Sequence, residues 1–127
     1  MKRIVIPAVL VISAQLLVSC DPNNNYRMVV QNNTAYTLLI MPDSHVLPAN
    51  GAAVLYQHDG LGGPGTNGTC VGSIMIDSIT ATVPADSSLR VTLNLNDENV
   101  WFYSKEGSTA KGFKTECRAT ISNEDIK

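Results

Sequence analysis

The sequence has few of the features that mark an enzyme, a nucleic-acid-binding protein or a membrane-spanning protein. It contains no GxSxG or HExxH motif and no CxxC pair, so no hydrolase elbow, zinc-protease site or redox motif is indicated. The 9 basic residues, against 11 acidic ones, form no cluster, which argues against nucleic acid or anionic lipid headgroups as partners. No apolar run reaches the roughly 20 residues that span a bilayer. We therefore expect a non-enzymatic protein without a cofactor or metal.

The N-terminus carries the most specific pattern in the chain. Lys2 and Arg3 precede an uncharged, mostly apolar run over residues 4–18, as in an export signal. This run ends in Leu17-Val18-Ser19-Cys20, which resembles the bacterial lipobox. The resemblance implies transfer of diacylglycerol to the Cys20 thiol, cleavage before it and acylation of its new amino group. Three acyl chains would hold the protein firmly, since a single myristoyl chain binds only marginally. The alternative is an ordinary secretory signal that ends in a cysteine by chance.

The lipobox divides the chain into three expected parts. Residues 1–19 form the signal peptide, residues 20–25 form the acylated cysteine and a flexible tether, and residues 26–127 form one domain. The tether after Cys20 spans at most about 17 Å, so the domain would work close to a membrane. Asp21 resembles the inner-membrane retention signal of enteric bacteria, a rule that does not extend reliably to other phyla. We expect the bacterial cell envelope, the outer membrane more than the inner one, with the leaflet open.

Short alternating runs separated by turn residues dominate the domain, and no window has a sustained helical period. The cleanest alternation covers residues 89–95, and Asn32-Asn33 and residues 96–99 are expected turns. Asp77-Ser78 marks a change of parity, hence a bulge or turn. A single antiparallel β-sandwich of about seven strands follows, of the immunoglobulin-like or transthyretin-like type. The expected strands are residues 26–31, 35–41, 52–57, 70–83, 89–95, 100–104 and 115–121.

Cys70 and Cys117 remain once Cys20 is assigned to lipid. In an exported, oxidising compartment an even pair favours a disulfide, which would contribute about 4 kcal/mol by closing a long loop. The alternative is two separate buried thiols that pack as small hydrophobes.

The arrangement resembles small envelope lipoproteins of Bacteroidota. The resemblance depends on Asn32-Asn33-Thr34, Asp77-Ser78-Ile79 and the segment 119–125, in addition to the lipobox. It implies a β-sandwich in the cell envelope and supplies no catalytic residues. Asp77-Ser78-Ile79 also matches the acceptor pattern for O-glycosylation in this group, with Ser78 as the attachment point. The alternative is a strand irregularity in which Asp77 bonds its own backbone.

Trp101 and Tyr103 are the main candidates for a ligand platform. Both fall on one strand face and, if exposed, would stack on sugar rings or a partner protein. The competing interpretation, which we favour, places the single Trp in the core.

Other candidate sites are weaker. The GxGxxG pattern over residues 60–65 contains Pro64 and leads into an apparent strand rather than a helix, so nucleotide binding is not indicated. Scattered metal-capable residues lack the fixed spacing of a real metal site, and they are Asp43, His45, His58 and Asp59.

Loops on a rigid sandwich commonly carry recognition, and two loops are expected here, over residues 58–69 and 105–114. The sequence therefore predicts a lipid-anchored binding or scaffold protein with a protein or glycan partner. An envelope inhibitor or immunity protein with apolar loop tips, such as Leu61 or Phe113, is one alternative. A glycan-binding accessory lipoprotein is the other.

Overall fold

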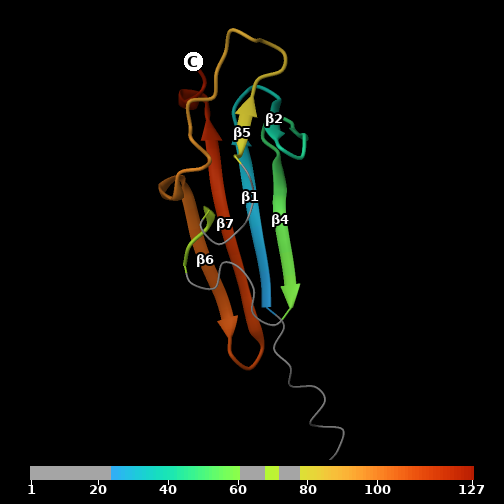
Figure 1. Ribbon diagram of the computed structural model, residues 1–127, viewed down its shortest axis with the longest axis vertical. Helices are drawn as coiled ribbons and strands as arrows, with labels where there is room; N and C mark the ends of the chain where they lie inside the picture. Colours follow the sequence, from blue (N-terminus) through green and yellow to red (C-terminus); the bar gives the residue numbers. More distant parts are fainter. Residues whose placement is uncertain (1–23, 61–67, 72–77) are drawn as a thin grey trace, which may run out of the picture.

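The computed structural model of the protein describes residues 24–60, 68–71 and 78–127. These residues form an all-β structure with two sheets (Figure 1). A four-stranded sheet has the order β4-β1-β7-β6 and a three-stranded sheet has the order β3-β2-β5. Within the described residues, no helix is long and apolar enough to cross a membrane. The strands are β1 (Asn24–Asn33), β2 (Leu38–Met41), β3 (His45–Leu47), β4 (Ala52–Gly60), β5 (Thr80–Thr82), β6 (Trp101–Ser108) and β7 (Gly112–Ser122).

Strand β1 lies in the interior of the four-stranded sheet and has a different partner on each side. It pairs antiparallel with β4 and parallel with β7, from Asn25 opposite Lys114 to Asn33 opposite Ser122. The expectation of a purely antiparallel fold is therefore wrong. Parallel neighbours need a long crossover connection, and here most of the chain, including the second sheet, lies between β1 and β7.

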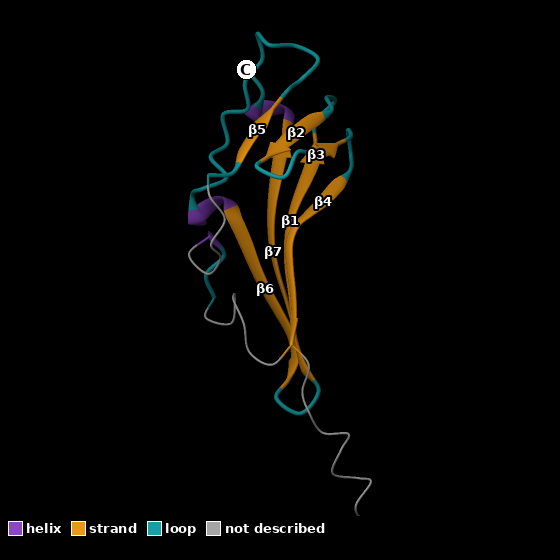
Figure 2. Cartoon of the chain, turned by 45° about the vertical axis from the view of Figure 1, so that its right-hand side comes forward, coloured by secondary structure: helices purple, strands orange, loops and turns teal. Residues whose placement is uncertain are grey.

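The two sheets share one cluster of buried side chains. The inward-facing positions of β1 and β7 alternate with polar positions, as a half-buried strand requires. The three-stranded sheet lies over the upper half of the four-stranded sheet, and the lower ends of β1, β6 and β7 extend beyond it (Figure 2). The cluster contains Tyr26, Met28, Val30, Leu38, Ile40, Leu47, Cys70, Ile79, Val83, Leu95, Trp101, Cys117, Ala119 and Ile121.

The segment over residues 89–95 is not a strand, although its alternation is the cleanest in the sequence. Its apolar side chains are half-buried or buried and its polar ones exposed, as predicted. Its backbone, however, makes only isolated bridges, with Thr82 opposite Arg90 and Val91 opposite Ile126. The backbone of Arg90 exchanges hydrogen bonds of 2.8 and 3.0 Å with Lys127. The alternating sequence therefore correctly indicated that one face of this segment is buried. Burial of one face does not require continuous hydrogen-bonded pairing with a neighbouring strand.

Several strand boundaries also differ from the prediction. Residues 105–114 are not a loop, because β6 and β7 continue through them and pair as far as Ser108 opposite Gly112. Strand β4 extends through His58 and Asp59, and β1 starts at Asn24, inside the expected tether. A 3-10 turn, η3 (Glu98–Val100), takes the place of the expected hairpin turn over residues 96–99. The short strand β3 was not predicted from the sequence.

Asn32 is a buried polar residue at the end of β1 where a turn was expected. Its side-chain amide donates to the carbonyl oxygens of Tyr36, Leu47 and Pro48 at 2.7, 3.1 and 3.1 Å. Its side-chain oxygen accepts from the Thr34 backbone N–H at 2.9 Å and from the Thr34 hydroxyl at 2.7 Å. One side chain thus satisfies polar groups at the end of β3 and in the connection between β1 and β2, as buried polar groups require.

The predicted disulfide is present, with an S–S distance of 2.07 Å between Cys70 and Cys117. It ties residues 68–71 to the inward face of β7. The Glu98 carboxylate accepts hydrogen bonds from the backbone N–H groups of Cys70 and Val71, the second at 2.7 Å. The bridge and this carboxylate together fix the segment against the lower part of the core.

Candidate functional site

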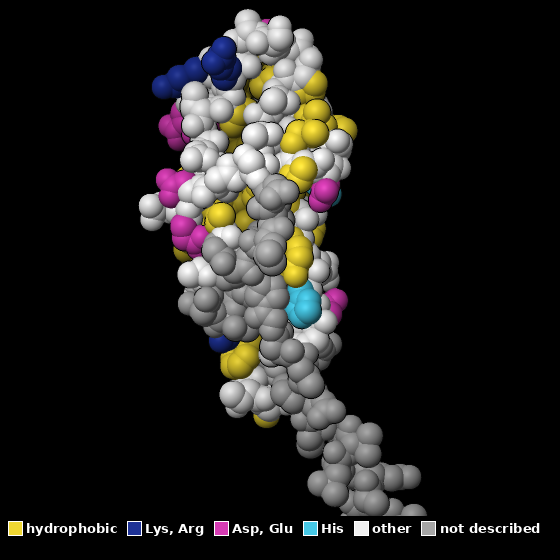
Figure 3. Space-filling model, in the orientation of Figure 1, with side chains coloured by type: hydrophobic (Ala, Val, Ile, Leu, Met, Phe, Trp, Pro, Cys, Tyr) yellow, Lys and Arg dark blue, Asp and Glu magenta, His cyan; other side chains and the backbone are white. Residues whose placement is uncertain are grey.

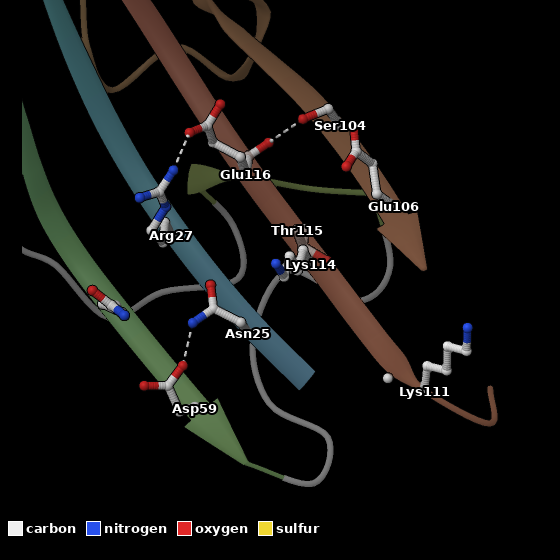
Figure 4. A pocket seen from close by; sticks show the side chains of 11 residues that line it. Asn25, Arg27, Asp59, Ser104, Glu106, Lys111, Lys114, Thr115 and Glu116 are labelled. Carbon is white, nitrogen blue, oxygen red and sulfur yellow. Dashed lines mark hydrogen bonds and ion pairs between the residues drawn. The ribbon is translucent and has the colours of Figure 1, made fainter. Parts of the chain in front are cut away.

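A polar hollow of about 600 Å³ lies on the outer face of the four-stranded sheet, the face opposite the buried cluster (Figure 4). All four strands of that sheet contribute to it, and the turn between β6 and β7 closes its lower end. The residues that line it are Asn25, Arg27, Gln57, Asp59, Ser104, Glu106, Lys111, Gly112, Lys114, Thr115 and Glu116.

Strand register arranges the polar side chains of the hollow in two rows across the sheet. Alternate residues of a strand share a face, so the outward positions of neighbouring strands lie beside one another. The upper row is Gln57, Arg27, Glu116 and Ser104, on β4, β1, β7 and β6 in turn. The lower row is Asp59, Asn25, Lys114 and Glu106 on the same strands.

Ion pairs fix the upper row. Glu116 accepts from Arg27 at 2.9 Å and from Arg118 at 3.1 Å, and Arg118 also donates to the Gln31 side chain at 3.0 Å. These hydrogen bonds, that of Arg118 foremost, hold the pKa of the Glu116 carboxyl below its usual value. Glu116 is therefore a permanent anion at neutral pH that orients two guanidinium groups along the sheet.

The lower row has charges that are not paired in this way. The Asn25 side-chain amide donates to the Asp59 carboxylate. The Arg27–Glu116 and Arg118–Glu116 ion pairs both lie outside this row. Lys114 and Glu106 lie opposite one another in the register without an ion pair. Both are exposed, so they are available to a ligand that offers the complementary charges.

The hollow is lined by polar and charged groups of several kinds. It offers amide, hydroxyl, ammonium, guanidinium and carboxylate groups, but no cysteine or histidine. Over the described residues, no three side chains of metal-ligating type come together. His58 and Asp59 are adjacent in β4 and therefore face opposite sides of the sheet, and Asp43 and His45 lie at the turn between β2 and β3. The metal-capable residues of the sequence are thus not gathered into one site.

The Trp101 and Tyr103 platform is absent. Trp101 is only 7% exposed, belongs to the core and donates from its indole N–H to the Leu95 carbonyl oxygen at 2.8 Å. Tyr103 shares its inward face and is half-buried, whereas Phe102 between them is 73% exposed. The core interpretation of Trp101 is confirmed, since the large ring belongs to the buried cluster and its N–H still finds a partner.

Tyr26 is an unusual residue on the inward face, behind the hollow. It is 3% exposed, its ring lies 5.8 Å from that of Tyr56, and its hydroxyl has no hydrogen-bond partner among the described residues. Burial, with a smaller contribution from the charge of Glu98, raises the pKa of Tyr26 to about 12. The hydroxyl is therefore held neutral over the whole physiological range.

Other predicted site residues have simpler outcomes. Ser78 is exposed and precedes β5, so its glycosylation stays a prediction. Cys20, Asp77, and residues 61–67 of the glycine-rich stretch lie outside the described residues.

On the face shown in Figure 3, hydrophobic side chains gather over the upper half of the molecule.

The chain matches no known protein-family model, and no curated protein or solved structure is significantly similar to it. The site must therefore be interpreted from its own residues.

The rows of the hollow were not predicted from the sequence. A signal for them exists, because polar residues alternate with buried ones along β1 and β7, as in Arg27 beside Met28 and Glu116 beside Cys117. What the sequence does not contain is the strand order and register that bring these alternating positions side by side.

Proposed function

We propose that the chain is a lipid-anchored, non-enzymatic protein of the bacterial cell envelope that binds a protein partner through the hollow. The observation that carries the proposal is the pair of polar rows, which display exposed groups of both charges on one sheet face. Arrays of mixed charge give specificity and orientation to protein–protein contacts. A rigid sheet holds the groups in register, so a partner would not have to order them on binding.

The proposed anchor lies next to this surface. Strand β1 starts at Asn24, four residues after Cys20. Four residues span at most about 14 Å, so acylation of Cys20 would place the hollow close to the bilayer. We propose the outer membrane rather than the inner one.

We further propose that the two sheets form a β-sandwich of the immunoglobulin-like or transthyretin-like type. The shared cluster of buried side chains from both sheets supports this assignment.

The alternative functions have less support. An inhibitor or immunity protein was expected to present an apolar loop tip, but Phe113 lies in β7 with the Lys105 Nζ atom 4.2 Å from its ring centroid. Leu61 lies outside the described residues. The glycan-binding alternative depended on exposed Trp101 and Tyr103, but Trp101 is buried and Tyr103 is half-buried.

Site-specific photo-crosslinking in intact cells tests the binding surface. A photoreactive amino acid at Gln57, which is exposed at the edge of the hollow, should crosslink one protein in stoichiometric yield. The control position is Ser87, exposed in the connection after β5. Asp59→Lys, which reverses a charge of the lower row, should reduce the Gln57 crosslink at least tenfold, and Lys127→Glu should leave it unchanged. Equal crosslinks from Gln57 and Ser87, or no effect of Asp59→Lys, would rule out the hollow as the binding surface.

A further inference from the structure

The turn between β6 and β7 lies at the same end of the molecule as the start of β1 (Figure 1). The Phe113 backbone N–H donates to the Asn24 side-chain oxygen at 2.9 Å, and Asn25 is the register partner of Lys114. The turn over residues 109–111 therefore lies beside the first described residue of the chain. Anything that binds the chain just before β1 therefore also lies close to this turn.

Basic side chains are concentrated around the turn. Lys105, Lys111 and Lys114 are exposed within ten residues, with Glu106 as the one acidic residue among them. Lys105 packs its ammonium against the Phe113 ring, 4.2 Å from the centroid, which keeps that charge at the hairpin. The chain as a whole is acidic, so this hairpin is a local exception with an excess of positive charge.

Distances from the proposed anchor separate this end from the other. Cys20 lies within about 14 Å of Asn24, because four residues reach no further. Strand β1 has 10 residues. At about 3.3 Å per residue, its far end lies roughly 30 Å beyond its start. Charges interact strongly only within a Debye length of about 8 to 10 Å. A bilayer that holds Cys20 would therefore attract the lysines of the turn and leave the C-terminal end outside its field.

We infer that the turn between β6 and β7 rests on the bilayer surface, where Lys111 and Lys114 contact lipid headgroup phosphates. This inference rests on the proposed lipid anchor. The anchor alone allows the domain to tumble about its tether, whereas the second contact fixes the sheet with its hairpin toward the membrane. The upper end of the molecule, with the C-terminus, then points away from the bilayer. The sequence alone argued against such headgroup contacts, because it showed no basic cluster.

Fluorescence quenching on vesicles tests this orientation. The acylated full chain carries a fluorescent amino acid at Ala110 in the turn or at Ser87 in the connection after β5, both exposed. It is reconstituted in phosphatidylcholine vesicles with or without phosphatidylglycerol and with a headgroup nitroxide lipid. We expect quenching at Ala110 and not at Ser87, stronger with phosphatidylglycerol and weaker at 500 mM salt.

Matched variants test the role of the lysines. Each lysine near an anionic surface is worth about fivefold in binding, so K111Q/K114Q should lower the ratio of quenched to unquenched lifetime components about 25-fold. The control K127Q removes one charge at the opposite end and should leave the ratio unchanged.

Flotation of the same vesicles separates the two ways to fail. If the protein does not float with the vesicles, or if Cys20→Ser floats as well as the parent chain, the anchor itself is wrong. If the protein floats but Ala110 is quenched no more than Ser87, the orientation is wrong and the anchor stands. Quenching at Ala110 that persists unchanged in K111Q/K114Q overturns the phosphate contact.

Discussion

The upper and lower halves of the four-stranded sheet are built on the same strands but are closed in different ways. In the upper half, the three-stranded sheet covers the inward face, and the Asn32 side chain satisfies the buried polar groups of the connections. In the lower half, the strands run beyond that sheet, and the Cys70–Cys117 disulfide holds a short segment over the inward face. The outer face there is the charged hollow. Packing and buried hydrogen bonds secure the upper half, while a covalent bond secures the half that carries the proposed site.

Of the changes considered, loss of the disulfide should reduce the stability of the protein most, and it should weaken the lower half before the upper half. Replacement of both cysteines, Cys70→Ala with Cys117→Ala, is expected to lower the free energy of unfolding by about 4 kcal/mol, because the bridge closes a long loop in the unfolded chain. Urea unfolding of the two proteins measures the difference. Hydrogen exchange should rise first at the lower end of β1 and β7. Uniform loss of protection in both halves would contradict the division drawn here.

Asn32→Ala should weaken the upper half by about 3 kcal/mol. The change leaves the Thr34 backbone N–H and three carbonyl oxygens without the partner that Asn32 provides. Asn33→Ala is the matched control, because Asn33 is exposed on the same strand. If both variants lose the same stability in urea, the buried network does not secure this half.

Tyr26→Phe should change the response to alkali by about 2 to 3 kcal/mol. The pKa of Tyr26 is raised to about 12 from 10, so its hydroxyl ionises in the unfolded chain before it does in the folded one. The contribution of the Tyr26 hydroxyl to the free energy of unfolding is therefore fully present below pH 10 and is lost between pH 10 and pH 12. The variant should lose less stability over that window. At pH 7 it should be at least as stable as the parent, because burying a hydroxyl that has no hydrogen-bond partner among the described residues costs free energy that Phe avoids.

Urea unfolding at pH 8, 10 and 12 checks this prediction, with Tyr36→Phe as the control at an exposed position. An equal alkaline loss in the parent and in Tyr26→Phe would show that the buried hydroxyl does not carry the effect.

Glu116→Gln should have the smallest effect, below about 1 kcal/mol, because its partners Arg27 and Arg118 are exposed to solvent. The pKa of Glu116 is lowered, so its contribution is present above the unfolded pKa and disappears as pH falls through the folded value. The parent should thus lose more stability than the variant between pH 5 and pH 3. Glu124→Gln, at an exposed position, serves as the control.

The sequence predicted the features that depend on local pattern. The sequence pattern located β1 and β7 to within a few residues at each end. The even pair of cysteines in an exported protein predicted the Cys70–Cys117 disulfide, and the need for a large central side chain placed Trp101 in the core. Ser122 and Asp125 also begin a terminal 3-10 turn, with the Asp125 carboxylate accepting from the Ser122 backbone N–H at 2.8 Å.

The features that depend on long-range pairing were not predictable in the same way. The parallel pairing of β1 with β7 joins the two ends of the domain, and no local pattern encodes it. The extent of the β6–β7 hairpin was missed because small and polar residues such as Gly107 are typical of loops. The hollow follows from both features, since its rows exist only when four strands are in register.

Mass spectrometry of the protein extracted from bacterial membranes tests the central claim most directly. The account predicts a mature chain that starts at Cys20, carries a diacylglyceryl group on its thiol and an acyl group on its amino nitrogen, and contains the Cys70–Cys117 disulfide. A chain that retains Met1, or that starts at Cys20 with an unmodified thiol, would contradict it.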